Sequence, residues 1–152
     1  MDGTAGIYAR ESQFLGRYVQ LGIAQGRVLS VEFPGSVDDV ETGHELLDRV
    51  EAYLAGEEDN FEDVTLAMTM PTARRDIYEA VREVPYGEEA SLEQITMMVP
   101  GKNSDDGSDL EAVRDALAQN PIPVFIPTHR VRGTPVGMHS DIAEKLRSVE
   151  GL

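Results

Sequence analysis

Residues 120–133, NPIPVFIPTHRVRG, carry a short apolar run that ends on polar and titratable side chains. The run lies at 124–126, and Pro127 separates it from Thr128 and His129. A short apolar run bounded by prolines predicts a buried strand rather than a helix. Residues that follow a buried strand are held by a rigid scaffold, as binding and catalytic residues commonly are. Thr128 and His129 are therefore the first candidates for a functional site.

The length and composition indicate a globular protein. A chain of 152 residues suits one domain or two small ones and is long enough to bury a core. Hydrophobic residues make up 41% of the chain, and the mean hydropathy is −0.29. Because no window contains ~18 consecutive apolar residues, we expect no membrane span and no membrane partner. The start of the chain, MDGTAGIYARES, lacks the basic and apolar segments of a secretory signal, which favours a cytoplasmic protein.

The chain contains no cysteine. Disulfides, thiolate metal sites and a cysteine nucleophile are therefore excluded. We expect neither a bound metal nor a cofactor.

The chain is strongly acidic, with a formal net charge of −15 at pH 7. Lysine occurs only at Lys102 and Lys145, and every other fixed cation is arginine. An excess of carboxylates with few lysines is typical of halophilic proteins, which work where the Debye length is about 3 Å at 1 M salt. The alternative is a solvated acidic surface in a protein of ordinary salt. In both cases the attraction to phosphate is weak, because nucleic-acid binding depends on clustered cations.

The pattern divides the chain near residues 60–71 into a first unit, about 1–66, and a second, about 70–152. Strands are expected at 6–12 and 16–34, with a turn at Gln25-Gly26. A helix follows within 44–58 and ends near Gly56. It carries one apolar face, formed by Leu46, Leu47, Val50, Tyr53 and Leu54. No chemical motif is found in this unit, and His44 is expected on the helix surface.

The second unit is mostly helical. A helix is expected within 71–84, ending before Pro85, and an apolar stripe predicts a last helix after residue 140. The loop between the two middle helices is longer than the ~3–4 residues of an ordinary helix-turn-helix. Each of the three later helices is expected to begin at a serine, and the first two show a capping-box pattern: Ser91 with Gln94, Ser108 with Glu111, and Ser140.

This succession resembles the O6-alkylguanine-DNA alkyltransferases and their alkyltransferase-like relatives. Their signature is Asn-Pro-x-Pro-x-x-x-Pro-Cys-His-Arg-Val, and residues 120–131 read NPIPVFIPTHRV, with Thr128 in place of Cys. IYEAVREVPYGE, VGMHS and AEKLRSVEG resemble three further family segments. The resemblance implies a fold of class α/β plus α, in which a small N-terminal sheet domain with a helix precedes a helical, winged-helix-type domain with a modified helix-turn-helix. It covers residues 71–152 well and the first unit only by architecture.

The resemblance also implies the chemistry of the site. In the family, a His linked through water to a Glu helps a Cys become the thiolate that accepts the alkyl group once. Thr128, His129 and Glu150 occupy these three positions, and Asn120 ties the preceding turn to the active-site loop. A neutral Thr hydroxyl is a weak nucleophile toward an alkyl carbon. We therefore expect that the family activity is lost and that the chain is not an enzyme.

Alkyltransferase-like proteins lack the Cys but still bind damaged guanines, using an Arg finger and a Tyr that helps to rotate the phosphate. By the resemblance, Glu111 stands at the finger position and Leu92 at the Tyr position. The recognition segment at 105–115 carries five carboxylates against Arg114 alone. A carboxylate inserted into a base stack is repelled by phosphates and releases no counter-ions. DNA binding by this helix is expected to be weak.

Several of these residues have structural alternatives. His129 could hydrogen-bond a backbone carbonyl, and Arg130 could cap carbonyls rather than contact a phosphate. Glu111 could act only as the capping partner of Ser108. His139, beside Ser140, could line the pocket or lie on a surface loop.

Two functional hypotheses follow. The first is an inactive homologue repurposed as a protein-interaction or small-ligand module. The second is a non-enzymatic binder of O6-alkylguanine lesions that works at high salt. A third, in which Thr128 and His129 form a hydrolytic pair, has no oxyanion or specificity motif to support it.

Overall fold

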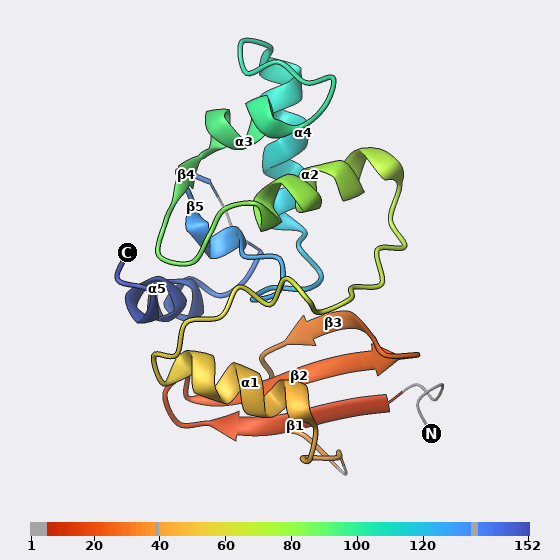
Figure 1. Ribbon diagram of the computed structural model, residues 1–152, viewed down its shortest axis with the longest axis vertical. Coiled ribbons are helices and arrows are strands. Elements are labelled where there is room, and N and C mark those ends of the chain that lie inside the picture. The colour runs from red at the N-terminus through yellow and green to blue at the C-terminus, as the bar shows by residue number, and fades with distance from the viewer. Residues whose placement is uncertain (1–5, 39, 135–136) are drawn as a thin grey trace.

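The computed structural model describes residues 6–38, 40–134 and 137–152. A sheet with one helix forms one end of the molecule and three helices form the other, with α5 beside their junction (Figure 1). This confirms the expected fold class. The elements in chain order are β1 (Gly6–Ser12), β2 (Arg17–Ala24), β3 (Arg27–Glu32), α1 (Glu45–Leu54), α2 (Thr72–Arg82), β4 (Ala90–Ser91), α3 (Leu92–Met98), α4 (Gly107–Ala118), the short 3-10 helix η1 (Thr128–Arg130), β5 (Val131–Arg132) and α5 (Ser140–Val149).

The sheet is antiparallel, in the order β1-β2-β3. Gln25 and Gly26 join β2 to β3 with φ angles of 54° and 74°. Positive φ at both central residues is what a two-residue hairpin turn of this kind requires, so the predicted turn is confirmed. The outer edge of β1 is covered where Ala9 N donates to Glu41 O at 2.9 Å.

α1 packs on one face of the sheet (Figure 1). Leu47, Val50, Tyr53 and Leu54 are buried, as the apolar spacing predicts. His44 is the N-cap of this helix, because its Nδ1 accepts a hydrogen bond from Leu46 N at 3.0 Å. His44 was expected on the helix surface; it is half-buried and stands at the start of the helix, which it caps.

The helix starts in the second half agree with the sequence in one case and differ in two. Ser91 and Gln94 form the predicted capping box at the start of α3. At α4 the N-cap is Asp106, whose side chain accepts from Ser108 N at 2.9 Å. The predicted pairing of Ser108 with Glu111 is therefore wrong, because the helix begins two residues earlier. His139 precedes α5, and no side chain caps that helix.

The apolar run at 124–126 is not a strand. The chain turns sharply there: Ile126 N donates to Ile122 O at 2.9 Å, and Val124 has a φ of 76°. The flanking prolines at 121, 123 and 127 have no N–H to give to a ladder, which explains why this buried segment forms a turn. Ile122, Phe125 and Ile126 still point into the core.

The two halves are joined by contacts in the interior. One cluster of buried apolar side chains runs through both, and Val31 N donates to Pro121 O at 3.1 Å. Arg82 donates to the carbonyls of Phe61 and Phe125, which ties the connector to the turn. The division into domains 1–66 and 70–152 stays a prediction.

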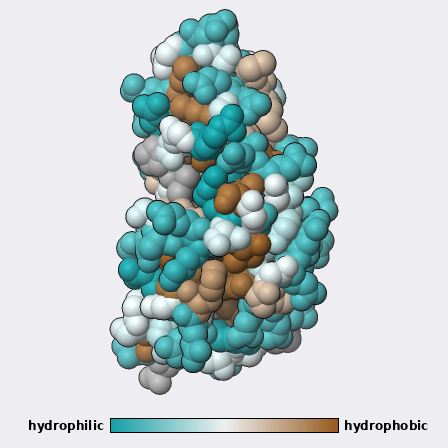
Figure 2. Space-filling view, turned by 90° about the vertical axis from the view of Figure 1, so that its left-hand side faces the viewer, coloured by the Kyte–Doolittle hydropathy of each residue, from teal (hydrophilic) through white to brown (hydrophobic). Residues whose placement is uncertain are grey.

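Hydrophilic side chains cover most of the face in Figure 2, as expected for a chain of net charge −15. In the part of the chain that the structure describes, every helix is too short or too polar to cross a membrane.

Candidate functional site

A buried polar network lies where α1, η1 and the end of α5 meet. Glu150 is at its centre: its Oε2 lies 2.8 Å from His129 Nε2 and 2.9 Å from Arg130 Nη2, and its Oε1 lies 2.8 Å from Arg130 Nε. Gly87 N donates to Oε1 at 3.0 Å, and the Tyr53 hydroxyl donates to Oε2. The carboxylate therefore has five donors around it, which is how a protein keeps a buried charge satisfied.

These contacts fix the protonation of the network. Burial alone would raise the pKa of Glu150, but hydrogen bonds from His129 and Arg130 outweigh it and hold that pKa at about 2. Glu150 is therefore an anion at neutral pH. Burial lowers the pKa of His129, only partly offset by Glu150, so the ring is neutral there. Burial, and next the charge of Glu150, raise the pKa of Tyr53, which stays protonated.

Arg130 is held on two sides. Besides Glu150, it donates from Nη1 to Val84 O at 2.8 Å, and the whole side chain is 2% exposed. It is therefore a structural ion-pair partner and carbonyl ligand, and it cannot reach a DNA phosphate. Of the two alternatives that the sequence leaves for Arg130, these contacts favour the binding of a carbonyl over contact with a ligand or a DNA phosphate.

Thr128 is wholly buried at the start of η1. Asn120 Nδ2 donates to Thr128 Oγ1 at 3.0 Å and to Ile126 O at 2.9 Å, while Asn120 Oδ1 accepts from Ile122 N at 2.9 Å. Asn120 thus holds the turn from both ends and places the hydroxyl of residue 128. The structure brings Asn120, Thr128, His129 and Glu150 into one region.

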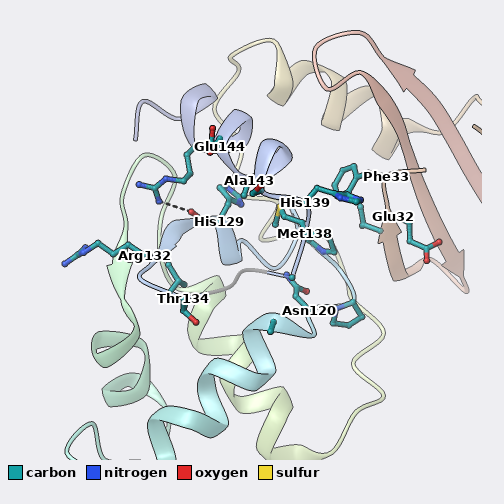
Figure 3. Close-up of a pocket in the computed structure, with 18 of the residues that line it drawn as sticks. Glu32, Phe33, Asn120, His129, Arg132, Thr134, Met138, His139, Ala143 and Glu144 are labelled. Carbon is teal, nitrogen blue, oxygen red and sulfur yellow. Dashed lines mark hydrogen bonds between the residues drawn. The ribbon is translucent and has the colours of Figure 1, made fainter. Parts of the chain in front are cut away.

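A cavity of about 1140 Å³ opens beside this region. Asn120 and His129 line it together with Met138 and His139 from the loop before α5, while Glu32 and Phe33 line it from the end of β3 and beyond (Figure 3). Arg132 also lines it, but its side chain points away from His129 in that view. The pocket therefore has one wall from each half of the molecule.

The structure places the other predicted site residues in three different surroundings. His139 and Ser140 line the pocket. Glu111 and Arg114 are exposed on α4, away from it. Leu92, which the resemblance places at the Tyr position, is 4% exposed and belongs to the core, so it is not placed to contact a ligand or DNA. Val136, which begins the predicted pocket segment, lies outside the described residues.

No group of three or more His, Asp or Glu side chains within the described ranges is placed to hold a metal ion.

Tyr53 is a residue of this polar network that the sequence did not indicate. The sequence of the first unit shows no chemical motif, yet the Tyr53 hydroxyl reaches Glu150 and lies 3.2 Å from His129 Nε2. Its place on the apolar face of α1 predicts burial, and a buried Tyr hydroxyl needs a polar partner. The sequence therefore indicates that the Tyr53 hydroxyl has a buried polar partner, but it does not indicate that this partner is Glu150.

Residues 72–149 match the family described as "6-O-methylguanine DNA methyltransferase, DNA binding domain". A methylated-DNA–protein-cysteine methyltransferase of Methanosarcina acetivorans is 35% identical over 127 residues, which cover 80% of this chain and 78% of that protein. The chain belongs to this methyltransferase family. A second relative, from Metallosphaera sedula, is 30% identical over 70% of this chain and 66% of its own length.

Solved structures share the fold of this family member. The O6-methylguanine methyltransferase of Mycobacterium tuberculosis superposes with a TM-score of 0.75 and 21% identity, covering 97% of this chain and 93% of that one. The O6-methylguanine-DNA methyltransferase of Pyrococcus kodakaraensis gives 0.69 with 19% identity, covering 96% and 99%. The whole architecture, the sheet part included, is therefore the family fold.

Proposed function

We propose that this chain is a non-transferring member of the methyltransferase family and that its pocket binds a small ligand reversibly. The observation that carries the proposal is the complete buried network around a threonine. Glu150 has all its donors, Asn120 holds Thr128, and the pocket beside them is open. We take Thr128 to stand at the acceptor position of the family signature.

Thr128 is a poor alkyl acceptor for two reasons. A neutral hydroxyl is a weak nucleophile toward carbon. A nearby base can convert a thiol to a thiolate at neutral pH, but a hydroxyl is too weak an acid for His129 to convert it to an alkoxide. The hydroxyl is also 0% exposed and receives a hydrogen bond from Asn120. The site keeps its shape without the group that performs the transfer.

The surface of α4 supports a small ligand over duplex DNA. Glu111 and Asp115 are exposed on this helix, and Arg114 is the exposed cation among them. Exposed carboxylates repel phosphates and give no counter-ion release on binding. A partner protein with a basic surface would meet no such repulsion, so the same helix is compatible with the protein-interaction form of this proposal.

The experiment has a chemical and a binding arm. Intact-mass measurement after incubation with O6-benzylguanine tests for transfer, and isothermal titration with O6-methylguanosine tests for reversible binding. Ser140→Trp fills the mouth of the pocket and is expected to abolish binding. Asp141→Trp, on the adjacent exposed residue of α5 outside the pocket lining, is its matched control. Stoichiometric mass gain in the wild-type chain would refute the proposal.

A second candidate is a non-enzymatic binder of O6-alkylguanine lesions in DNA repair that works at high salt. Two observations favour it: the helix pair α3–α4 packs as one unit, and the match over 72–149 is to a domain described as DNA-binding. A methyltransferase of M. tuberculosis with the same fold (TM-score 0.73, 22% identity) has been solved in complex with DNA. Fluorescence anisotropy with O6-methylguanine and undamaged duplexes in molar KCl tests it.

A further inference from the structure

Tyr53 brings a hydroxyl from α1 into the network of the second half. The ring is 1% exposed and is held edge-on by Phe61 and Tyr86, with ring centroids 5.5 Å and 6.0 Å away. Its hydroxyl donates to Glu150 Oε2 and lies 3.2 Å from His129 Nε2. The hydroxyl is therefore placed by packing, independently of any ligand.

The protons of the network can be assigned one by one. Glu150 is a carboxylate and can only accept, so the Tyr53 proton points to its Oε2. His129 Nε2, at 2.8 Å from the same oxygen, must also present a proton. A neutral imidazole has a single N–H, so His129 Nδ1 carries a lone pair. This nitrogen is buried and has no hydrogen-bond partner within the described residues.

The charges around His129 come from several elements. Glu150 follows α5, Arg130 is in η1, and Arg147 of α5 donates to the His129 carbonyl at 3.0 Å. Both guanidiniums disfavour a second proton on the ring, and Glu150 favours it. Each donor to Glu150 weakens the pull of that carboxylate on His129. Tyr53 is such a donor, and it is neutral.

We propose that Tyr53 is a positioning residue of the pocket: by sharing Glu150 with His129 it keeps the His129 ring neutral, with its proton on Nε2 and its Nδ1 free to accept. This inference rests on the proposed ligand-binding function and names the chemistry of the ligand. The ligand is neutral and presents an N–H or O–H group to Nδ1 through one water, because the His129 side chain has no exposed surface of its own. Planar heterocycles with a ring N–H are of this class.

The test is the titration of His129 by 15N and 13C NMR in the wild type and in Tyr53→Phe. The resonances of the three histidines are assigned with His44→Gln and His139→Gln. In the wild type, the neutral form of His129 should show a protonated Nε2 and an unprotonated Nδ1. In Tyr53→Phe the pKa of His129 should rise by roughly half a unit or more, because Glu150 loses a donor and favours the imidazolium more strongly.

Tyr78→Phe is the matched control. Tyr78 is 0% exposed and its hydroxyl donates to Ala116 O at 2.7 Å, outside the network. The two variants remove the same atom from equally buried rings, so a loss of thermal stability is expected in both, and it should be larger in Tyr53→Phe because its partner is charged. A shift in His129 confined to Tyr53→Phe supports the positioning role. An unchanged tautomer and titration in a folded Tyr53→Phe protein would overturn it.

The ligand chemistry is tested with a pair of purines that differ by one methyl group. Theophylline has a ring N–H where caffeine has N–CH3. Theophylline should move the Nδ1 resonance of His129 and caffeine should not, whereas an equal effect of both would overturn the assignment of Nδ1 as the acceptor. If neither compound binds, a methylxanthine ligand is ruled out, while the role of Tyr53 is still decided by the titration.

Discussion

The imidazole of His129 and the carboxylate of Glu150 are joined by a 2.8 Å hydrogen bond between two side chains that are both wholly excluded from solvent. The same carboxylate neutralises Arg130. The donors stabilise the anion in this buried place, and the anion in turn satisfies the buried Arg130 charge. Stability, protonation and any surviving chemistry of this protein therefore depend on the same carboxylate.

Glu150→Gln is expected to destabilise the fold by about 3–5 kcal/mol, because it leaves the buried Arg130 charge without its partner. Chemical denaturation at pH 7 measures this loss. Glu89→Gln is the matched control: Glu89 also pairs with an arginine, Arg147, at 2.7 Å, but at the surface. Its cost should be about 1 kcal/mol or less. Equal costs for the two variants would contradict the central role of Glu150.

Acid should destabilise the wild type in two steps. The pKa of Glu150 is lowered to about 2 from 4.5, so its stabilising contribution is complete above pH 4.5 and is lost as pH falls toward 2. Burial also lowers the pKa of His129 from 6.5. As the pH falls below 6.5, this histidine is therefore protonated in the unfolded chain before it is protonated in the folded chain, and stability begins to fall. Urea midpoints measured from pH 8 to pH 3 should be level down to about pH 6.5 and decline below it, and Glu150→Gln should flatten the decline below pH 4.5.

Incubation of the wild type with O6-benzylguanine should leave its intact mass unchanged, since the chain has no cysteine and Thr128 is a weak nucleophile. Thr128→Cys should restore measurable alkylation, because His129 and Glu150 are already placed at 2.8 Å from each other. The double variant Thr128→Cys with Glu150→Gln should react more slowly. Reaction of Thr128→Cys no faster than that double variant would show that the pair does not activate a thiol.

Gly137 is the tightest point of the pocket wall. It has a φ of +77°, and an added Cβ would lie 2.7 Å from Leu117 O and 2.9 Å from Asn120 Cβ. Gly137→Ala should therefore cost more than the ~1 kcal/mol of a left-handed backbone alone and should displace Asn120. Gly133→Ala is the control, because Gly133 has a φ of +82° with open space around the added Cβ. Thermal unfolding of the two variants separates steric from backbone strain, and equal losses would rule out the close contact.

The sequence predicted the elements whose periodicity is long, and the signature residues that it singled out lie close together in the structure. α1, α2 and the hairpin turn at Gln25 appear where the patterns place them. The prediction of a strand at 124–126 was wrong because it rested on apolar composition alone. The flanking prolines lack the N–H groups that a strand needs for pairing, and this decides the conformation. At α4, Asp106 and Ser108 are both good caps, and composition alone could not choose between them.

Tyr53 could not be predicted as a site residue for a different reason. Its periodicity assigns it to the core, and the core is where its ring lies. The contact with Glu150 joins residues 97 positions apart and depends on how α1 and α5 are placed in space. Local patterns carry no information on such a contact.

Glu111→Arg separates the two functional candidates. Glu111 is exposed on α4, and it is not needed as a cap because Asp106 fills that role. The substitution should therefore cost little stability. If the chain binds lesions as the family resemblance implies, replacing a repelled carboxylate by an inserted arginine should tighten duplex binding by roughly 1–3 kcal/mol, and the gain should shrink as salt rises.

We expect little change in duplex binding instead, because Asp105, Asp109 and Asp115 remain on the same segment and Leu92 is buried where a flipping residue would have to be exposed. Fluorescence anisotropy with O6-methylguanine and normal duplexes, from low salt to molar KCl, measures both variants. Asp115→Arg is the matched control for a general gain of positive charge on α4. The wild type would be a lesion binder if, at any one salt concentration, it preferred the alkylated duplex by about tenfold or more. Such a preference corresponds to about 1.4 kcal/mol of binding free energy.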